Sequence, residues 1–184
     1  MITDEELVSQ FRNGELNAGG MLYQRYKTEV FSFCRRMLND QESAGDAAQE
    51  TFLKMMTGIQ SLNHHIAFKA WLFAIARNEV LMVVRHRKII PMESFHDETT
   101  EVWDEKTPFS ITADNDIQII LMNAVNCLKP AYREAVLLRD VEQLTYEEIA
   151  AVTGTTVGSV KSKLFKSRVI LNEKLRPYFE EIKQ

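Results

Sequence analysis

The sequence predicts an all-α protein made of two small helical domains joined by an acidic linker. Apolar residues recur at helical spacing on both sides of the chain's middle, and strand-like alternation is missing from the first ninety residues. Acidic residues concentrate between the two helical parts. A chain of 184 residues with 45% apolar residues has room for two such domains.

Charge segregation locates the linker. Residues 1–90 hold 11 Lys and Arg against 10 Asp and Glu, and residues 117–184 hold 10 against eight. Residues 91–116 hold only Lys106 against eight acidic residues, and they contain two prolines and no helical apolar period. We therefore expect domains at 1–90 and 117–184, with a flexible linker at 91–116 that carries most of the net charge of −4.

Four helices are expected in the first domain. Thr3 with Glu6 three residues later predicts a capping box, and that helix ends at Gly14. A second helix at 21–39 has one apolar face, and further helices cover 44–59 and 67–88. The apolar face of the second helix consists of Leu22, Tyr26, Val30, Phe33 and Met37.

Several polar residues of this domain have an ordinary structural explanation. Asp46, Gln49 and Glu50 fall on the first turns of the expected third helix, where the helix dipole favours acidic residues, and spacing alone favours that explanation. The adjacent His64 and His65 read as loop residues, because neighbouring side chains diverge and no partners for a shared metal are evident.

The end of the fourth helix leaves two alternatives open. The run "RHRK" at 85–88 is consistent with a solvated helix end, where cations are favoured by the dipole, and equally with phosphate contacts. Trp71, at helical spacing among apolar residues, is more typical of a core than of a base-stacking surface.

The second domain has the pattern of a helix-turn-helix. Thr145 and Glu148 form a second expected capping box, and that helix ends at Gly154. Ala150 permits close helix crossing, and Val160 packs back between the two helices. Two amphipathic helices at 119–128 and 130–142 precede the pair, which makes a four-helix domain.

The second helix of this motif concentrates positive charge without an acidic residue in 155–170. Val160, Leu164 and Leu171 face inward and leave an outward face suited to a DNA major groove. A solvated helix is the ordinary explanation for such a cluster, but an exposed phenylalanine between lysines favours DNA. That face consists of Lys161, Ser162, Phe165 and Lys166.

Three motifs in order resemble one family over nearly the whole chain. "DAAQETFLKM" is similar to a D-x-x-Q-E-x-F signature, "AFKAWLFAIARNEV" to an F-x-x-W-L-x-x-I-A-x-N segment, and 132–168 to a helix-turn-helix region. They resemble the bacterial RNA polymerase sigma factors of the extracytoplasmic-function (ECF) type, which keep the second and fourth conserved sigma regions.

The resemblance implies three sets of binding residues. Docking on the clamp coiled coil of the polymerase's largest subunit falls to Asp46, Gln49, Glu50 and Phe52, and the second domain is expected on the flap. The −10 element is assigned to Asn63, His64, His65, Arg77, Asn78, Arg85, Arg87 and Lys88, with the loop at 63–67 as the pocket for a flipped-out base. The −35 element is assigned to Thr156, Ser159, Lys161, Ser162, Phe165, Lys166 and Arg168.

Three departures from the family pattern stand out. Gly19 replaces a common aromatic residue and is expected to loosen or shorten the start of the second helix. Met82 replaces a frequent aspartate, with no evident consequence. Lys161, Lys163 and Lys166 replace arginines, and lysine lacks the fork that contacts guanine bidentately, so the −35 preference is expected to differ.

In the family the linker threads the polymerase's active-site cleft towards the RNA exit channel. Its net charge of −7, eight acids against Lys106, is consistent with RNA mimicry and equally with a plain soluble tether. Both explanations stay open here.

The sequence thus indicates a promoter-specificity subunit, with an anti-sigma protein as an expected partner. The alternative is a stand-alone helix-turn-helix repressor or activator, which would not need the "DAAQETF" surface. No catalytic set, cofactor motif or metal cluster is apparent. Cys34 and Cys127 are expected as reduced core residues, and without a membrane-length apolar run or a signal sequence we expect a cytoplasmic protein.

Overall fold

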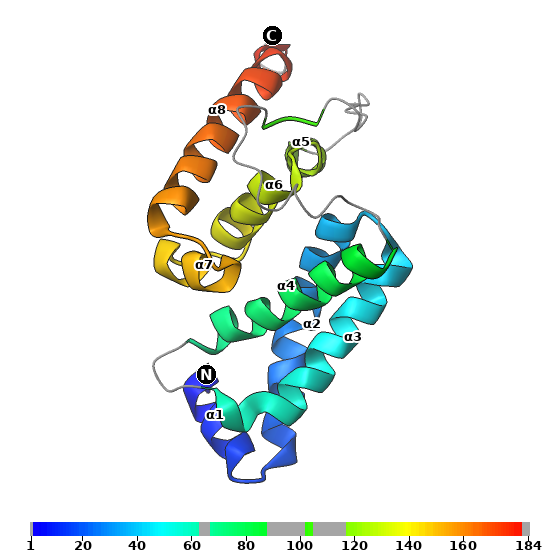
Figure 1. The fold of residues 1–184 in the computed structure, drawn as a ribbon, viewed down its shortest axis with the longest axis vertical. Coiled ribbons are helices and arrows are strands. Elements are labelled where there is room, and N and C mark those ends of the chain that lie inside the picture. Colours follow the sequence, from blue (N-terminus) through cyan, green and yellow to red (C-terminus); the bar gives the residue numbers. More distant parts are fainter. Residues whose placement is uncertain (1, 63–66, 88–101, 105–116, 182–184) are drawn as a thin grey trace. The chain divides into compact units, whose positions relative to one another are not determined.

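The computed structural model describes residues 2–62, 67–87, 102–104 and 117–181. Helices make up both parts of the chain, as Figure 1 shows, and no strand occurs among these described residues. They form two compact units, one built mainly on α1 to α4 and the other mainly on α5 to α8. The predicted all-α class is confirmed.

The first unit contains α1 (Asp4–Arg12), α2 (Leu16–Leu38), α3 (Gln41–Gly58) and α4 (Phe68–Arg87), with the 3-10 turn η1 (Ile59–Ser61) after α3. The predicted capping box of α1 is present: the Thr3 amide donates to Glu6 Oε2 at 2.8 Å, and the Glu6 amide donates to Thr3 Oγ1 at 3.2 Å. Gly14 follows α1 at φ +96°, where a Cβ would be strained.

The expectation for Gly19 was wrong. Helix α2 begins at Leu16 and runs through both Gly19 and Gly20 without interruption. A Cβ at Gly19 would lie 2.9 Å from the ring of Phe11, so the missing side chain lets α1 pack closely on α2. Packing against Phe11 outweighs the poor helix propensity of glycine at this position.

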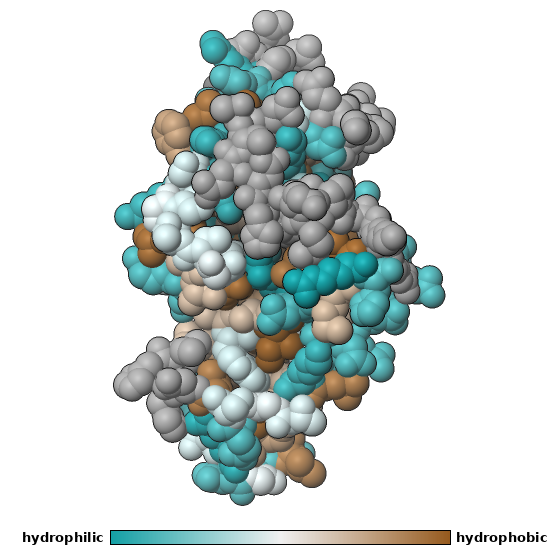
Figure 2. All heavy atoms as spheres, viewed as in Figure 1, coloured by the Kyte–Doolittle hydropathy of each residue, from teal (hydrophilic) through white to brown (hydrophobic). Residues whose placement is uncertain are grey.

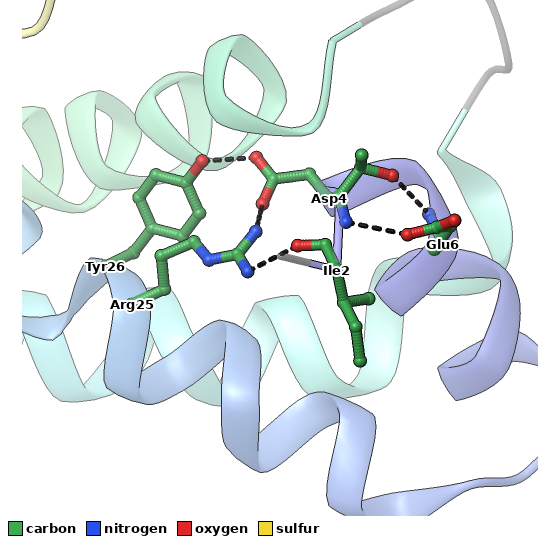
Figure 3. A network of polar contacts seen from close by, with 6 residues as sticks. Ile2, Asp4, Glu6, Arg25 and Tyr26 are labelled. Carbon is green, nitrogen blue, oxygen red and sulfur yellow. Dashed lines mark hydrogen bonds and ion pairs between the residues drawn. The ribbon is translucent and has the colours of Figure 1, made fainter.

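A polar network fastens the chain's start to α2, as Figure 3 shows. The Asp4 carboxylate accepts hydrogen bonds from Arg25 and from the Tyr26 hydroxyl, and Arg25 Nη2 also donates to the Ile2 carbonyl at 2.8 Å. Burial, and then the hydrogen bond to Asp4, raise the pKa of Tyr26. The hydroxyl therefore stays a donor at neutral pH.

Aromatic and apolar side chains fill the centre of the first unit. Phe33 of α2 meets Phe73 of α4 edge-to-face, with ring centroids 5.5 Å apart. Between α3 and α4, Lys54 and Glu79 form an ion pair at 2.6 Å. Cys34 is buried, as expected, and burial raises the pKa of its thiol to about 12.

The second unit contains α5 (Ile117–Asn126), α6 (Pro130–Val136), α7 (Tyr146–Thr153) and α8 (Val157–Glu181). A π-helical turn, η3 (Leu137–Val141), extends α6. Leu128, Tyr132, Leu138 and Ile149 are almost completely buried in this unit. The other free cysteine, Cys127, is buried as well.

The predicted helix-turn-helix is confirmed in α7 and α8. The Thr145 amide donates to Glu148 Oε2 at 2.7 Å, and the Glu148 amide donates to Thr145 Oγ1 at 3.2 Å, which is the expected capping box. Gly154 makes the turn at φ +66°. Thr156 then caps α8, because its hydroxyl accepts the Ser159 amide at 3.1 Å.

Part of the expected linker is docked on the second unit. Trp103 forms an antiparallel bridge with Leu128: the Asp104 amide donates to the Cys127 carbonyl at 2.7 Å, and the Lys129 amide donates to the Val102 carbonyl at 2.9 Å. Val102 is buried, and Trp103 packs beside a small apolar cluster of α5 and α8. A flexible linker was therefore the wrong expectation for these three residues.

Within the described ranges, no helix combines the length and the apolarity that a membrane span requires.

Candidate functional site

The outward face of α8 lies where the helical period predicts it. Val160 and Leu164 are each 1% exposed and anchor the helix, whereas Phe165 is 71% exposed. A single exposed apolar residue is common on protein surfaces, so it is the position of this ring among lysines that points to a ligand. The other members of the predicted face, Lys161, Ser162 and the half-buried Lys166, surround it, with Thr156 and Ser159 at the start of the helix.

The ring of Tyr146, the first residue of α7, contacts two cationic side chains beside this face. Arg139 lies 4.9 Å and Lys161 5.7 Å from the centroid of its ring. Such cation–π contacts hold a lysine that would otherwise be free to rotate. Tyr146 carries no signal in the sequence, because Arg139, Tyr146 and Lys161 meet only after the helices fold together.

Arg168, another of the predicted −35 residues, is held by an ion pair within the protein. Its Nη2 donates to Asp140 Oδ1 at 2.6 Å, from α8 to the turn η3. The pKa of Arg168 is raised, mainly by this hydrogen bond. The guanidinium is therefore oriented by Asp140 and is half exposed at the edge of the face.

Lys163 does not lie with the other cations of the basic cluster that the sequence indicates. It is 8% exposed, so it does not share the outward face with Lys161 and Phe165. It lies on the flank of α8 that faces Tyr132 of α6, in a polar hollow of about 310 Å³. The positive charge of α8 is thus divided between an open face and a recessed position.

The residues assigned to the polymerase lie on α3. Asp46, Gln49 and Glu50 are exposed, but α3 begins at Gln41, so they are beyond its first turn. The helix-dipole explanation for them is therefore wrong. Phe52 is 7% exposed and packs edge-to-face on Tyr23 with ring centroids 4.8 Å apart, so it supports this surface from below.

A largely apolar hollow of about 850 Å³ lies beside these residues, between α2 and α3. Leu53 and Met56 line it and are 51% and 41% exposed. Gly19 and Gly20 form part of its wall, which connects the departure at Gly19 to this surface. In Figure 2, hydrophobic side chains likewise interrupt the mostly hydrophilic surface of the face that is drawn.

The residues assigned to the −10 element are only partly brought together. Asn78 and Arg85 are exposed on α4, but Arg77 is 8% exposed, because its position falls in the row of Phe73, Ala76 and Val80 that faces the core. Arg77 therefore does not share the exposed side of α4 with Asn78 and Arg85, and its phosphate contact stays a prediction. Asn63, His64, His65, the side chain of Arg87, and Lys88 lie outside the described residues.

Half-buried Trp71 behaves as a packing residue. Its ring lies 3.5 Å from the position of a Cβ on Gly58 and 6.0 Å, between centroids, from Phe68. Met82, the other departure on α4, is 43% exposed. No group of three or more His, Cys, Asp or Glu side chains suited to a metal occurs in the described part of the chain.

Comparison with known families and proteins shows which family this chain resembles. The family description Sigma-70 region 2 matches residues 22–89, and Sigma-70 region 4 matches residues 118–171. The ECF RNA polymerase sigma-E factor of Haemophilus influenzae is 28% identical over 96% of this chain and 97% of its own length. The chain belongs to the ECF sigma factors. The RNA polymerase sigma-H factor of Pseudomonas aeruginosa is also 28% identical, over 97% of this chain and 96% of its own.

Solved structures agree with the sigma-factor fold. The sigma factor RpoE of Bartonella quintana, solved with the anti-sigma factor NepR, matches with a TM-score of 0.66 and 25% identity over 85% of this chain and 96% of that one. CnrH, solved with the cytosolic domain of CnrY, matches with a TM-score of 0.67 and 20% identity, over 95% and 97% of the two chains. In this sigma factor α7 and α8 as far as Leu171 lie within the region 4 match, and α3 lies within the region 2 match.

Proposed function

We propose that this sigma factor is the promoter-specificity subunit of a bacterial RNA polymerase. The first unit binds core polymerase through the exposed side of α3 and recognises the −10 element through α4 and the loop before it. The second unit docks on the flap and reads the −35 element with the outward face of α8. The chain itself has no catalytic activity and works in the cytoplasm.

The observation that carries this proposal is the presence of two different surfaces in one chain. The α8 face combines Phe165, 71% exposed, with Lys161 and Ser162, which suits base edges and thymine methyl groups in a major groove. The α3 surface combines carboxylates with exposed Leu53 and Met56, which suits a protein partner. A stand-alone repressor needs only the first of these surfaces.

Reconstitution tests the proposal. The purified chain is mixed with bacterial core polymerase, and complex formation and transcription from fragments of the host genome are measured. We expect a stoichiometric complex that starts transcription at promoters sharing −35 and −10 elements. Binding of the free chain to DNA without any complex with core polymerase favours the repressor or activator instead.

Control by an anti-sigma protein is part of the proposal, and the partner of the related RpoE supports it. Pull-down from the host by the tagged chain, followed by transcription assays with the captured protein, tests it. The expected protein prevents the chain from joining core polymerase. A captured protein that leaves transcription unchanged contradicts this part.

Two explanations of the acidic linker stay open, RNA mimicry and a soluble tether. Most of the linker lies outside the described residues. Neutralising its eight acidic residues and measuring the ratio of abortive to full-length transcripts separates them. A changed ratio supports mimicry, and an unchanged ratio leaves the tether.

A further inference from the structure

The loop at 63–67, which the proposed function assigns to the −10 element, is joined at each end to a buried residue of the first unit. Leu62 precedes it at the end of η1, and Phe68 follows it as the first residue of α4. We call these two residues the loop anchors. Both are buried, so the side chains packed around them decide where the loop begins and ends.

The last residue of α1 holds the first anchor. Arg12 Nε donates to the Ile59 carbonyl at 3.1 Å, and its Nη2 donates to the Leu62 carbonyl. Gln60 Nε2 donates in return to the Arg12 carbonyl at 3.1 Å. A planar guanidinium can donate to two carbonyls at once, whereas an ammonium is a single point of charge. Arg12 therefore fixes both η1 and the residue from which the loop starts.

The first residue of α1 reaches the second anchor through a tyrosine of α2. The Asp4 carboxylate accepts a hydrogen bond from the Tyr26 hydroxyl, as Figure 3 shows. The Tyr26 ring packs on the Phe68 ring with centroids 5.5 Å apart, and the Lys69 ammonium lies 5.9 Å from the centroid of the Tyr26 ring. Asp4 therefore holds the far end of a ring that contacts the start of α4.

We propose that α1 positions both ends of the −10 loop and that Arg12 is a positioning residue for the recognition of one unpaired base. This inference rests on the proposed function, which gives that loop its role. A binding loop keeps its geometry only when packing and hydrogen bonds hold the residues that flank it. Helix α1 supplies these contacts on both sides, through Arg12 at Leu62 and through Asp4 at Phe68. The α1 side chains act through the anchors and not by touching DNA.

Base discrimination in single-stranded DNA tests this role. The probe is a fluorescent oligonucleotide with the non-template strand of the −10 element that holoenzyme recovers from the host genome, with one base replaced at a time. Fluorescence anisotropy measures the affinity of holoenzyme for each probe. At one position we expect a wrong base to lower the affinity of wild-type holoenzyme by about 30-fold, within the usual range for one mismatch.

Substitutions at Arg12 then connect that position to α1. Arg12→Met keeps a long side chain and removes both donors. We expect it to lower the discrimination at that position by about tenfold, the size of a lost charge-assisted hydrogen bond, and to leave the other positions unchanged. Affinities for core polymerase and for the −35 duplex should stay at the wild-type level. Arg12→Lys, which reaches one carbonyl, should lose less discrimination, and so should Asp4→Asn.

Glu6→Ala is the matched control on the same helix. It removes the capping box of α1 and so weakens the helix, but it leaves the contacts of Arg12 and Asp4 in place. It should retain wild-type discrimination. Thermal melting shows whether each variant stays folded, and Arg12→Lys and Asp4→Asn provide the test if Arg12→Met does not.

The outcomes are distinct. If wild-type holoenzyme prefers no base at any −10 position, −10 recognition as proposed and this inference both fail. If wild type discriminates and the folded variants of Arg12 and Asp4 discriminate equally well, only the positioning role of α1 fails. A loss that is uniform over all positions, or that Glu6→Ala shares, also overturns it, because such a loss reports the stability of the unit and not the placement of one base.

Discussion

The two hollows of this sigma factor differ in size and in chemistry. The one between α2 and α3 holds about 850 Å³ and is walled by glycines, Phe52, Leu53 and Met56, whereas the one beside α8 holds about 310 Å³ and encloses Lys163 among hydroxyl groups. An apolar recess suits a protein surface, and a small recess lined by hydroxyl and ammonium groups suits a polar or anionic group. The two hollows therefore suit different classes of partner.

The largest effect is expected from putting charge into the apolar hollow. Leu53→Glu should lower the affinity for core polymerase by about 100-fold, the cost of losing a central apolar contact. Because Leu53 is 51% exposed, the thermal melting of the chain should hardly change. Fluorescence anisotropy with labelled chain measures the affinity.

Met82→Glu is the matched control, since Met82 is 43% exposed on α4 and does not line the hollow. It should retain wild-type affinity for core polymerase. Equal losses for both variants would mean that the α2–α3 hollow has no special role.

A smaller effect is expected from Phe165→Ala in the second unit. Losing the ring's contact with a thymine methyl should lower the affinity of holoenzyme for its −35 duplex by about tenfold, within the usual cost of one mismatched base pair. Replacing the contacted thymine by uracil removes the same methyl from the DNA. Wild type should respond to that replacement and Phe165→Ala should not; equal responses would exclude this contact.

Gly19 and Gly20 both line the α2–α3 hollow, but replacing each by alanine should change the free energy of unfolding in opposite directions. Gly19→Ala places a Cβ 2.9 Å from the Phe11 ring and should destabilise the chain by about 1–3 kcal/mol. Gly20→Ala meets no atom within 4 Å and should stabilise α2 by about 0.5–1 kcal/mol. Urea unfolding followed by circular dichroism measures both. The same sign for both variants would contradict the packing that we describe.

The smallest effect is expected from exchanging cations on the α8 face. The double substitution Lys161→Arg and Lys166→Arg restores the fork that relatives use for guanine and should favour guanine at one −35 position, by less than about 3 kcal/mol. Selection of bound sequences from a randomised −35 duplex measures the preference. An unchanged preference would show that neither lysine contacts a base.

Much of this architecture was predictable because local rules govern it. The capping boxes at Thr3 and Thr145, the turn at Gly154 and the outward position of Phe165 all follow from short-range spacing. The roles of Gly19, Arg77 and Lys163 were not predictable in this way. Each depends on which side chain of another helix lies opposite, and spacing along one helix does not contain that information.

The docked segment Val102–Asp104 shows the same limit. Composition indicates a soluble tether throughout 91–116, yet one buried valine and two backbone hydrogen bonds fasten these three residues to the α5–α6 loop. Lys174 of α8 covers the Trp103 ring at 5.4 Å. Two apolar residues in an acidic run are too few for a periodic signal, but they are enough for a contact.

Measuring both affinities of two variants side by side tests the central claim, that the α2–α3 hollow and the outward face of α8 serve different partners. Leu53→Glu and Phe165→Ala are each titrated into core polymerase, and the holoenzymes formed at saturation are titrated with the −35 duplex. The account predicts that Leu53→Glu loses affinity only for core polymerase and Phe165→Ala only for DNA. Loss of both affinities in either variant, with the fold intact, would contradict it.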